Sequence, residues 1–171
     1  TLARMVRIEE RTTLLRRSAE DGDAAGTERA IVANAAKLVI VTAVADPEPR
    51  PRMIDRYLVA AYDAGMEPLI VLTKTDLADA APLTGLYSPL GVRCLATRLR
   101  PHGPETGPSQ VCGERPDDGV EAVRQALDGD VSVLVGHSGV GKSTLINALV
   151  PGADRATGHV NEVTGRGRHT S

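Results

Sequence analysis

The sequence has no Trp or Phe and only three Tyr in 171 residues. A hydrophobic core must therefore be built from Leu, Val, Ile and Ala, and 42% hydrophobic residues are enough for one compact domain. An excess of charge of either sign is also missing. The formal net charge of −2 gives no electrostatic signature of nucleic-acid binding, so any RNA contact has to come from local patches or from other segments.

Cysteines and long apolar stretches are scarce as well. Cys94 and Cys112 do not have the spacing of metal ligands, and we interpret them as reduced thiols, which excludes a disulfide framework. No apolar stretch reaches the length of a membrane span, and we find no signal peptide before the predicted fold. We therefore expect a cytoplasmic protein with no membrane partner.

The strongest motif is a glycine-rich loop of the form G-x-x-x-x-G-K-S. It consists of Gly136, His137, Ser138, Gly139, Val140, Gly141, Lys142, Ser143 and Thr144. An apolar run at 131–135 precedes it and a helical pattern at 142–150 follows, as a phosphate-binding loop requires. The glycines let backbone N–H groups approach phosphate oxygens at a helix N-terminus. Lys142 is then expected to contact the β- and γ-phosphates and Ser143 to ligate Mg²⁺.

A second, shorter motif lies earlier in the chain and consists of Thr73, Lys74, Thr75 and Asp76. It follows the apolar run 69–72 and so lies at a strand's carboxyl end, where open α/β sheets bind ligands. Asp76 is expected to accept hydrogen bonds from N1–H and the 2-amino group of guanine, and Lys74 to lay its stem across the base. These contacts select GTP. By itself the tetrapeptide is also compatible with a solvated surface turn.

The order of the two motifs is the most informative feature of the chain. In ordinary P-loop nucleotidases the phosphate loop opens the domain, and the base loop follows several βα units later. Here the base loop at 73–76 precedes the phosphate loop at 136–144. We therefore predict a guanine-nucleotide domain whose sequence is circularly permuted.

Four apolar runs alternate with helical patterns, which predicts a three-layer α/β P-loop domain with a mostly parallel sheet. The runs cover 38–44, 69–72, 92–96 and 131–135, and the helical patterns cover 54–61, 120–127 and 142–150. Ala96 and Thr97, at the end of the third run, are candidates for a backbone contact to guanine O6, although small residues at strand ends also serve packing. Segment 98–118 is rich in proline and glycine and is expected to be a surface insertion.

Both ends of the chain look incomplete for such a domain. Residues 1–10 partly alternate between apolar and polar, as in a half-buried strand, and we expect no partner strand before the nucleotide domain. Residues 1–17 are therefore interpreted as the remnant of a separate β-domain. The segment after the phosphate-loop helix lacks the strand that would carry an aspartate for Mg²⁺ and a glycine that senses the γ-phosphate.

Together these residues resemble the circularly permuted GTPases that act in late maturation of the small ribosomal subunit. The match includes the residues 11–16 (Arg-Thr-Thr-Leu-Leu-Arg), the base loop, the extended phosphate loop 136–147, and residues 165–170 (Gly-Arg-Gly-Arg-His-Thr). In that family an OB-type barrel precedes the GTPase domain and a zinc-binding domain follows it. The resemblance implies that 1–17 is a barrel remnant, that 18–171 is an incomplete GTPase domain in the order G4–G5–G1–G2, and that zinc ligands lie beyond Ser171.

The resemblance also implies roles for individual residues. It assigns 73–76 to the guanine base, 136–144 to the phosphates and Mg²⁺, and 158–171 to the first switch loop. Thr170 is then the candidate that closes on Mg²⁺ and the γ-phosphate. His169 is the candidate that positions the attacking water, and it could equally be structural or contact rRNA. Thr73 stands where the family usually has Asn, which is expected to loosen the tie between the two loops, and Ala96-Thr97 is a degenerate form of the usual Ser-Ala base contact.

The main hypothesis is a monomeric GTPase that binds GTP, GDP and Mg²⁺ and acts on the small ribosomal subunit and its rRNA. This chain alone is expected to be nearly inactive. One alternative is an RNA-binding assembly checkpoint that uses GTP as an affinity switch with negligible turnover. The others are a large-subunit permuted GTPase, in which Pro-Asn usually replaces Ser138-Gly139, and a P-loop ATPase or kinase with an accidental Lys-x-Asp turn.

Overall fold

The centre of the protein is a parallel sheet of four strands. The computed structural model describes residues 7, 10–17, 29–98, 119–150 and 153. The strands are β3 (Lys37–Ala43), β4 (Glu67–Thr73), β5 (Arg93–Ala96) and β6 (Ser132–Val135), in the order β5-β4-β3-β6. All neighbouring pairs are parallel. The four predicted strands and their parallel pairing are therefore confirmed.

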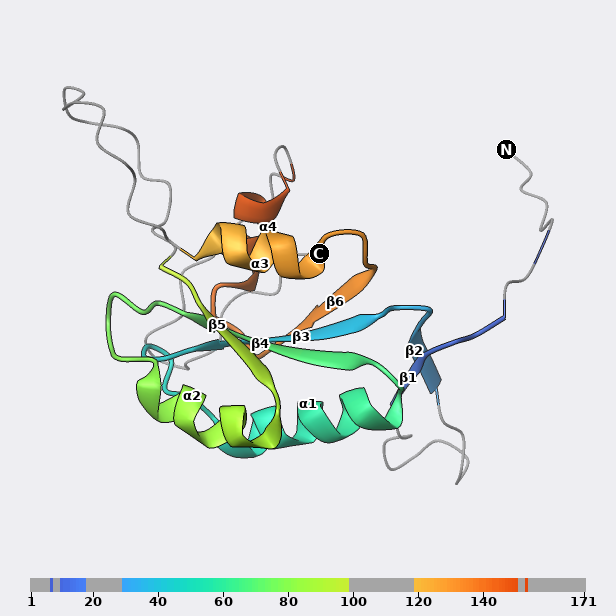
Figure 1. Ribbon diagram of the computed structural model, residues 1–171, viewed down its shortest axis with the longest axis horizontal. Coiled ribbons are helices and arrows are strands. Elements are labelled where there is room, and N and C mark those ends of the chain that lie inside the picture. Colours follow the sequence, from blue (N-terminus) through green and yellow to red (C-terminus); the bar gives the residue numbers. More distant parts are fainter. Residues whose placement is uncertain (1–6, 8–9, 18–28, 99–118, 151–152, 154–171) are drawn as a thin grey trace.

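Helices cover both faces of this sheet, so the predicted three-layer arrangement is confirmed as well. Helix α1 (Pro51–Asp63) and helix α2 (Ala81–Tyr87), which continues into the 3-10 turn η1 (Ser88–Leu90), lie on one face (Figure 1). Helices α3 (Val120–Leu127) and α4 (Lys142–Leu149) lie on the other (Figure 1). Helix α1 begins at Pro51, because proline at the first helical position costs no intrahelical hydrogen bond.

The alternation of side chains along the strands divides the core between the two faces. Ile40 packs with Ile54 of α1 and Leu83 of α2, whereas its neighbour Val41 packs with Val123 of α3 and Leu145 of α4. β3 and β4 are buried along almost their whole length, as expected for strands covered on both sides. This aliphatic packing holds the strand ends, and therefore the loops that follow them, in fixed positions.

Helix α2 and the turn η1 are elements that the sequence did not lead us to expect. Their segment, from Ala81 to Leu90, contains two prolines and a glycine and shows little helical periodicity. The helix is held by tertiary contacts: Leu83 and Tyr87 are buried against the sheet, and the Tyr87 hydroxyl donates to Asp55 of α1 at 3.1 Å. Burial and the neighbouring Asp55 carboxylate raise the pKa of Tyr87 to about 12.

A short antiparallel pair precedes the main sheet and corrects one expectation. Strand β1 (Leu14–Arg17) pairs with β2 (Arg29–Ala33), with an irregularity between Leu15 and Arg16. The expectation that no partner strand precedes the nucleotide domain is therefore wrong. β2 is largely exposed, so its short apolar run at 30–33 is only a weak strand signal in the sequence.

The strand pair is packed onto the main domain. The Leu14 amide donates to the Ala64 carbonyl at 3.2 Å, and Leu15 is buried with Ala61 and Met66 at the end of α1. The strand expected within 1–10 falls mostly outside the described residues, and the division of the chain at residue 17 stays a prediction. The expected insertion and the expected switch loop lie beyond the described residues, apart from Arg98.

Among the described parts of the chain, no helix is long and apolar enough to cross a bilayer.

Candidate functional site

The predicted motifs come together at one edge of the sheet. The register pairs Ala43 with Thr73 and Leu72 with Ala96, so β3, β4 and β5 end side by side. β6 lies on the other side of β3 and points the same way. The base loop after β4, the 96–97 segment after β5 and the phosphate loop after β6 are therefore neighbours. This is the edge of an open parallel sheet where ligands bind.

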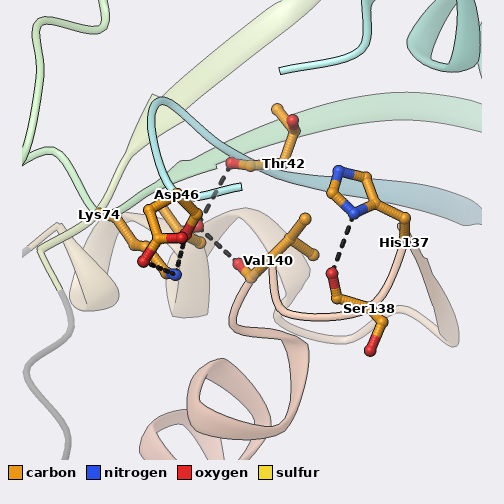
Figure 2. A network of polar contacts seen from close by, with 7 residues as sticks. Thr42, Asp46, Lys74, His137, Ser138 and Val140 are labelled. Atoms are coloured by element: carbon orange, nitrogen blue, oxygen red, sulfur yellow. Dashed lines mark hydrogen bonds and ion pairs between the residues drawn. The ribbon is translucent and has the colours of Figure 1, made fainter. Parts of the chain in front are cut away.

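The centre of the site is a hydrogen bond between the two loops. Thr73, at the end of β4, is 1% exposed. Its hydroxyl donates to the Val140 carbonyl of the phosphate loop at 2.6 Å and lies 3.3 Å from the Thr42 carbonyl; the two acceptor residues are labelled in Figure 2. Because a threonine hydroxyl has one proton, the shorter contact takes it. Thr73 thus links the base loop directly to the phosphate loop. The replacement of the family's usual Asn by Thr73 had predicted a looser link between these two loops.

Lys74 is held on the loop that follows β3. Its ammonium donates to the Asp46 carbonyl and lies 3.8 Å from the Asp46 carboxylate (Figure 2). The backbone of Lys74 is left-handed, with φ at 58°, which turns the chain sharply after the buried Thr73. Lys74 therefore stands at the rim of the site with its charge anchored. Its expected contact with a base stays a prediction.

The rest of the base loop is fastened to the end of β5. The Thr97 carbonyl accepts hydrogen bonds from the Thr75 amide at 3.3 Å and from the Thr75 hydroxyl at 3.1 Å. Thr97 is itself fixed, because its amide donates to the Leu72 carbonyl at 2.7 Å. Asp76 and Ala96 are both exposed next to these bonds. The two segments predicted to contact guanine are thus one connected unit that presents a carboxylate to solvent.

The phosphate loop begins with a glycine that no other residue can replace. An ideal Cβ on Gly136 would lie 2.3 Å from the Val41 carbonyl oxygen, and φ is +152°. Backbone atoms of β3 fill the place of a side chain there, so the loop leaves β6 close against the sheet. Val140 is fully buried in the middle of the loop, and the Leu145 amide bonds to the Gly141 carbonyl at 2.9 Å to begin α4.

Lys142 is preorganised by its own loop. Its ammonium donates to the carbonyls of Gly136 and His137, both at 2.7 Å, so the loop curls around the charge. Burial lowers the pKa of Lys142. Ser143 and Thr144 follow in the first turn of α4 and are half-buried. A half-buried lysine and a helix N-terminus in a glycine cradle form a binding place for an anion such as a phosphate group.

The imidazole of His137 faces away from this cradle. It lines a small hollow with Arg50, Met53 and Tyr57, between the phosphate loop and α1. Its Nδ1 donates to the Ser138 carbonyl at 2.9 Å in the neutral tautomer, which leaves Nε2 buried without a partner in the described structure (Figure 2). Any phosphate contact from this residue is consequently made by its backbone.

Burial and two neighbouring positive charges favour the neutral form of His137. Burial is the largest cause that lowers its pKa below the ordinary value of 6.5; the Ser138 carbonyl opposes this shift, and the charges of Arg50 and Lys142 add to it. A proton on this ring would place a further cation beside Lys142.

Among the described residues, the predicted Mg²⁺ ligand is Ser143 of the phosphate loop. Ser143 stands at the start of α4, where a hydroxyl serves as a Mg²⁺ ligand next to bound phosphates. Within the described ranges, no group of three or more His, Cys, Asp or Glu side chains is placed to hold a metal ion. His169 and Thr170, the other predicted participants, lie outside the described residues.

Sequence reasoning missed three residues of this edge. Asp46 anchors Lys74, Arg50 approaches the phosphate loop from the start of α1, and Gly119 lies against Ala96. None belongs to a motif. Asp46 and Arg50 lie in a proline-rich stretch whose sequence predicts only a turn. Gly119 has no sequence feature beyond its position before a predicted helix.

The bond between the loops predicts a stability effect. Thr73→Val keeps the shape of the side chain but leaves the buried Val140 carbonyl without its donor, so the free energy of unfolding should fall by about 1–3 kcal/mol. Urea denaturation followed by circular dichroism measures this. Thr42→Val is the matched control, because Thr42 is buried too but its hydroxyl makes only a 3.5 Å contact with its neighbour's carbonyl. Equal losses in the two variants would contradict the tie.

His137 predicts an acid-side loss of stability. Its pKa is lower in the folded than in the unfolded chain, so the unfolded state binds more protons below pH 6.5. The contribution of neutral His137 is complete above the unfolded value and is lost as the pH falls from 6.5 toward the folded pKa. His137→Gln should flatten the fall of unfolding free energy over this window, as urea titrations between about pH 5 and 8 measure. The same slope in both proteins would contradict the prediction.

Comparison with known proteins agrees with this geometry. Residues 8–171 match the family model described as RsgA GTPase. The chain is 43% identical over 150 residues to the small ribosomal subunit biogenesis GTPase RsgA of Ectopseudomonas mendocina (strain ymp), covering 87% of this chain and 40% of that protein. It is 42% identical over 167 residues to the RsgA of Pseudomonas syringae pv. syringae (strain B728a), covering 94% of this chain and 43% of that protein. The chain thus spans about two fifths of the length of these relatives.

Two solved structures share the fold. The crystal structure of YjeQ from Thermotoga maritima aligns with a TM-score of 0.62 and 27% identity, over 94% of this chain and 48% of that one. YloQ, described as a circularly permuted GTPase, aligns with a TM-score of 0.58 and 24% identity, over 87% and 45%. The α/β fold is therefore that of the circularly permuted GTPases, with the base loop ahead of the phosphate loop. Because the family model matches residues 8–171, which is nearly the whole chain, the chain belongs to the RsgA GTPase family.

Proposed function

We propose that this chain is the guanine-nucleotide-binding part of a GTPase that acts in maturation of the small ribosomal subunit. The observation that carries the proposal is the direct bond from Thr73 of the base loop to Val140 of the phosphate loop. It brings a base-reading carboxylate and a phosphate cradle into one site. The names of the relatives, small ribosomal subunit biogenesis GTPase, give the biological setting.

Each loop has a separate task in this proposal. Asp76 accepts hydrogen bonds from guanine N1–H and the 2-amino group, and the backbone at Ala96 and Thr97 faces O6. The backbone N–H groups from Gly139 to Thr144 hold the phosphates of GTP or GDP together with the Lys142 ammonium. Ser143 would supply its hydroxyl as a ligand to Mg²⁺. A bound Mg²⁺ would neutralise the charge that develops on the phosphates.

Hydrolysis needs residues beyond these loops. We assign His169 to positioning the attacking water and Thr170 to Mg²⁺ and the γ-phosphate, on resemblance to the family alone. An aspartate for Mg²⁺ and a glycine for the γ-phosphate belong to a strand that we place after residue 171, with a zinc-binding domain behind it. The whole protein is proposed to be a cytoplasmic monomer with the small subunit and its rRNA as partners.

Base selectivity is the first test of the proposal. Asp76→Asn should shift the preference from guanine toward xanthine nucleotides, because the 2-oxo group of xanthine accepts from the new amide. Competition by GTP, ATP and xanthosine triphosphate against a labelled guanine nucleotide measures this. Asp63→Asn, an equal charge change at the exposed end of α1, is the control and should leave the preference for GTP intact. Equal affinity of the unaltered protein for ATP and GTP would overturn the guanine assignment and favour an ATPase or kinase.

Turnover separates the remaining alternatives. The 171-residue chain should hydrolyse almost no GTP, whereas the chain extended through the next strand should show Mg²⁺-dependent hydrolysis that small subunits stimulate further. Phosphate release is measured for both, with small subunits, with large subunits and with neither. If the extended protein hydrolyses no GTP even with small subunits, the non-hydrolysing checkpoint is favoured. If only large subunits stimulate hydrolysis, the large-subunit permuted GTPase is favoured. Robust turnover by the short chain would show that the catalytic residues are misplaced.

A further inference from the structure

Gly119 lies against the end of β5 at the start of α3. Its backbone is left-handed, with φ at +76°. An ideal Cβ at this position would lie 1.9 Å from the Ala96 carbonyl oxygen, 3.1 Å from the Ala96 carbonyl carbon and 3.4 Å from the Thr97 Cα. All three are backbone atoms, which cannot swing aside as the tip of a side chain can. Even the methyl group of alanine must therefore push the Ala96–Thr97 backbone away.

The place that Gly119 touches is connected to the base loop. The Thr97 carbonyl accepts from both the amide and the hydroxyl of Thr75, one residue before Asp76. Thr97 is 1% exposed and has no room to absorb a shift by itself. A displacement at Ala96 is consequently passed through Thr97 to Thr75 and to the neighbouring carboxylate.

We propose that Gly119 is a positioning residue for guanine recognition: the absence of its side chain lets the start of α3 close on the Ala96 carbonyl and set the base loop. The inference rests on the proposed function, because it requires that Asp76 and the 96–97 backbone recognise the base. It goes further by assigning base selectivity in part to a residue outside both nucleotide loops, 43 positions beyond Asp76.

The geometry predicts which part of nucleotide binding a side chain at Gly119 would disturb. Relief of the overlap requires a movement of about 1 Å, the difference between 1.9 Å and the 3.0 Å below which real Cβ contacts are essentially never found. Recognition groups must be held to within about 0.5 Å of their productive positions. The three closest atoms to the added methyl belong to the base side of the site, and none belongs to the phosphate loop. Gly119→Ala should therefore weaken recognition of the base and spare the phosphates.

The chain offers a matched control at the other end of the same helix. Gly129, two residues after α3 ends, has the same φ of +76°, but an added Cβ would meet no atom within 4 Å. Gly129→Ala thus carries the same backbone strain and the same added methyl group without the overlap. A comparison of the two variants separates the contact with Ala96 from the general cost of alanine in a left-handed conformation.

The test measures the dissociation constants of GDP and ADP by isothermal titration, using the full-length protein and both variants. ADP reports the phosphate contacts without guanine-specific hydrogen bonds. Gly119→Ala should lower the GDP affinity at least about tenfold and change the ADP affinity less than about threefold, as expected when a charge-assisted hydrogen bond is misplaced. Gly129→Ala should keep the GDP-to-ADP ratio of the unaltered protein.

The outcomes separate this inference from the proposed function. A Gly119→Ala protein that keeps the normal GDP-to-ADP ratio, or loses both affinities equally, overturns the positioning role. If the unaltered protein itself does not prefer GDP, the proposed guanine site fails instead. Should Gly119→Ala not fold, Thr75→Val tests the same link without added bulk, since it removes the hydroxyl bond to the Thr97 carbonyl. A lower GDP-to-ADP ratio in that variant supports the inference, and an unchanged ratio overturns it.

Discussion

The site depends on one buried hydrogen bond, from the Thr73 hydroxyl to the Val140 carbonyl, which joins residues 67 positions apart. Burying a hydroxyl and a carbonyl costs free energy unless the two groups form a hydrogen bond. The folded chain therefore strongly favours this contact. It fixes the distance between the loop proposed to read the base and the loop proposed to hold the phosphates. A rigid spacing of this kind suits a ligand such as GTP, whose base and phosphates are joined through one ribose and can therefore span only a limited range of distances.

The sheet explains why reversing the order of the loops does no harm. The site is assembled from the carboxyl ends of parallel strands, and β3 stands between β4 and β6 whichever of its neighbours comes first in the chain. Only the positions of strand ends matter for ligand binding, and aliphatic packing on both faces holds them. Circular permutation changes the connections at the surface and leaves this arrangement intact.

The predictable parts of the protein were those specified locally. Buried parallel strands are continuous apolar runs, and the phosphate loop needs glycines and Lys142 at fixed spacing, so both could be recognised in the sequence. Features that depend on distant partners could not. Helix α2 forms because Leu83 and Tyr87 are buried against the sheet, Lys74 is held by Asp46, and the role of Gly119 follows from a strand end that no sequence window contains.

The most direct test of the two-loop site is a crystal structure of the chain with GDP and Mg²⁺. We predict that the guanine ring lies next to Lys74 with Asp76 in hydrogen-bonding contact with N1 and the 2-amino group. The β-phosphate should lie in the cradle formed by Gly136 to Ser143. The Thr73 hydroxyl should still donate to the Val140 carbonyl. A nucleotide whose phosphates fill the cradle while its base points away from Asp76, or a base loop that separates from Val140 on binding, would contradict it.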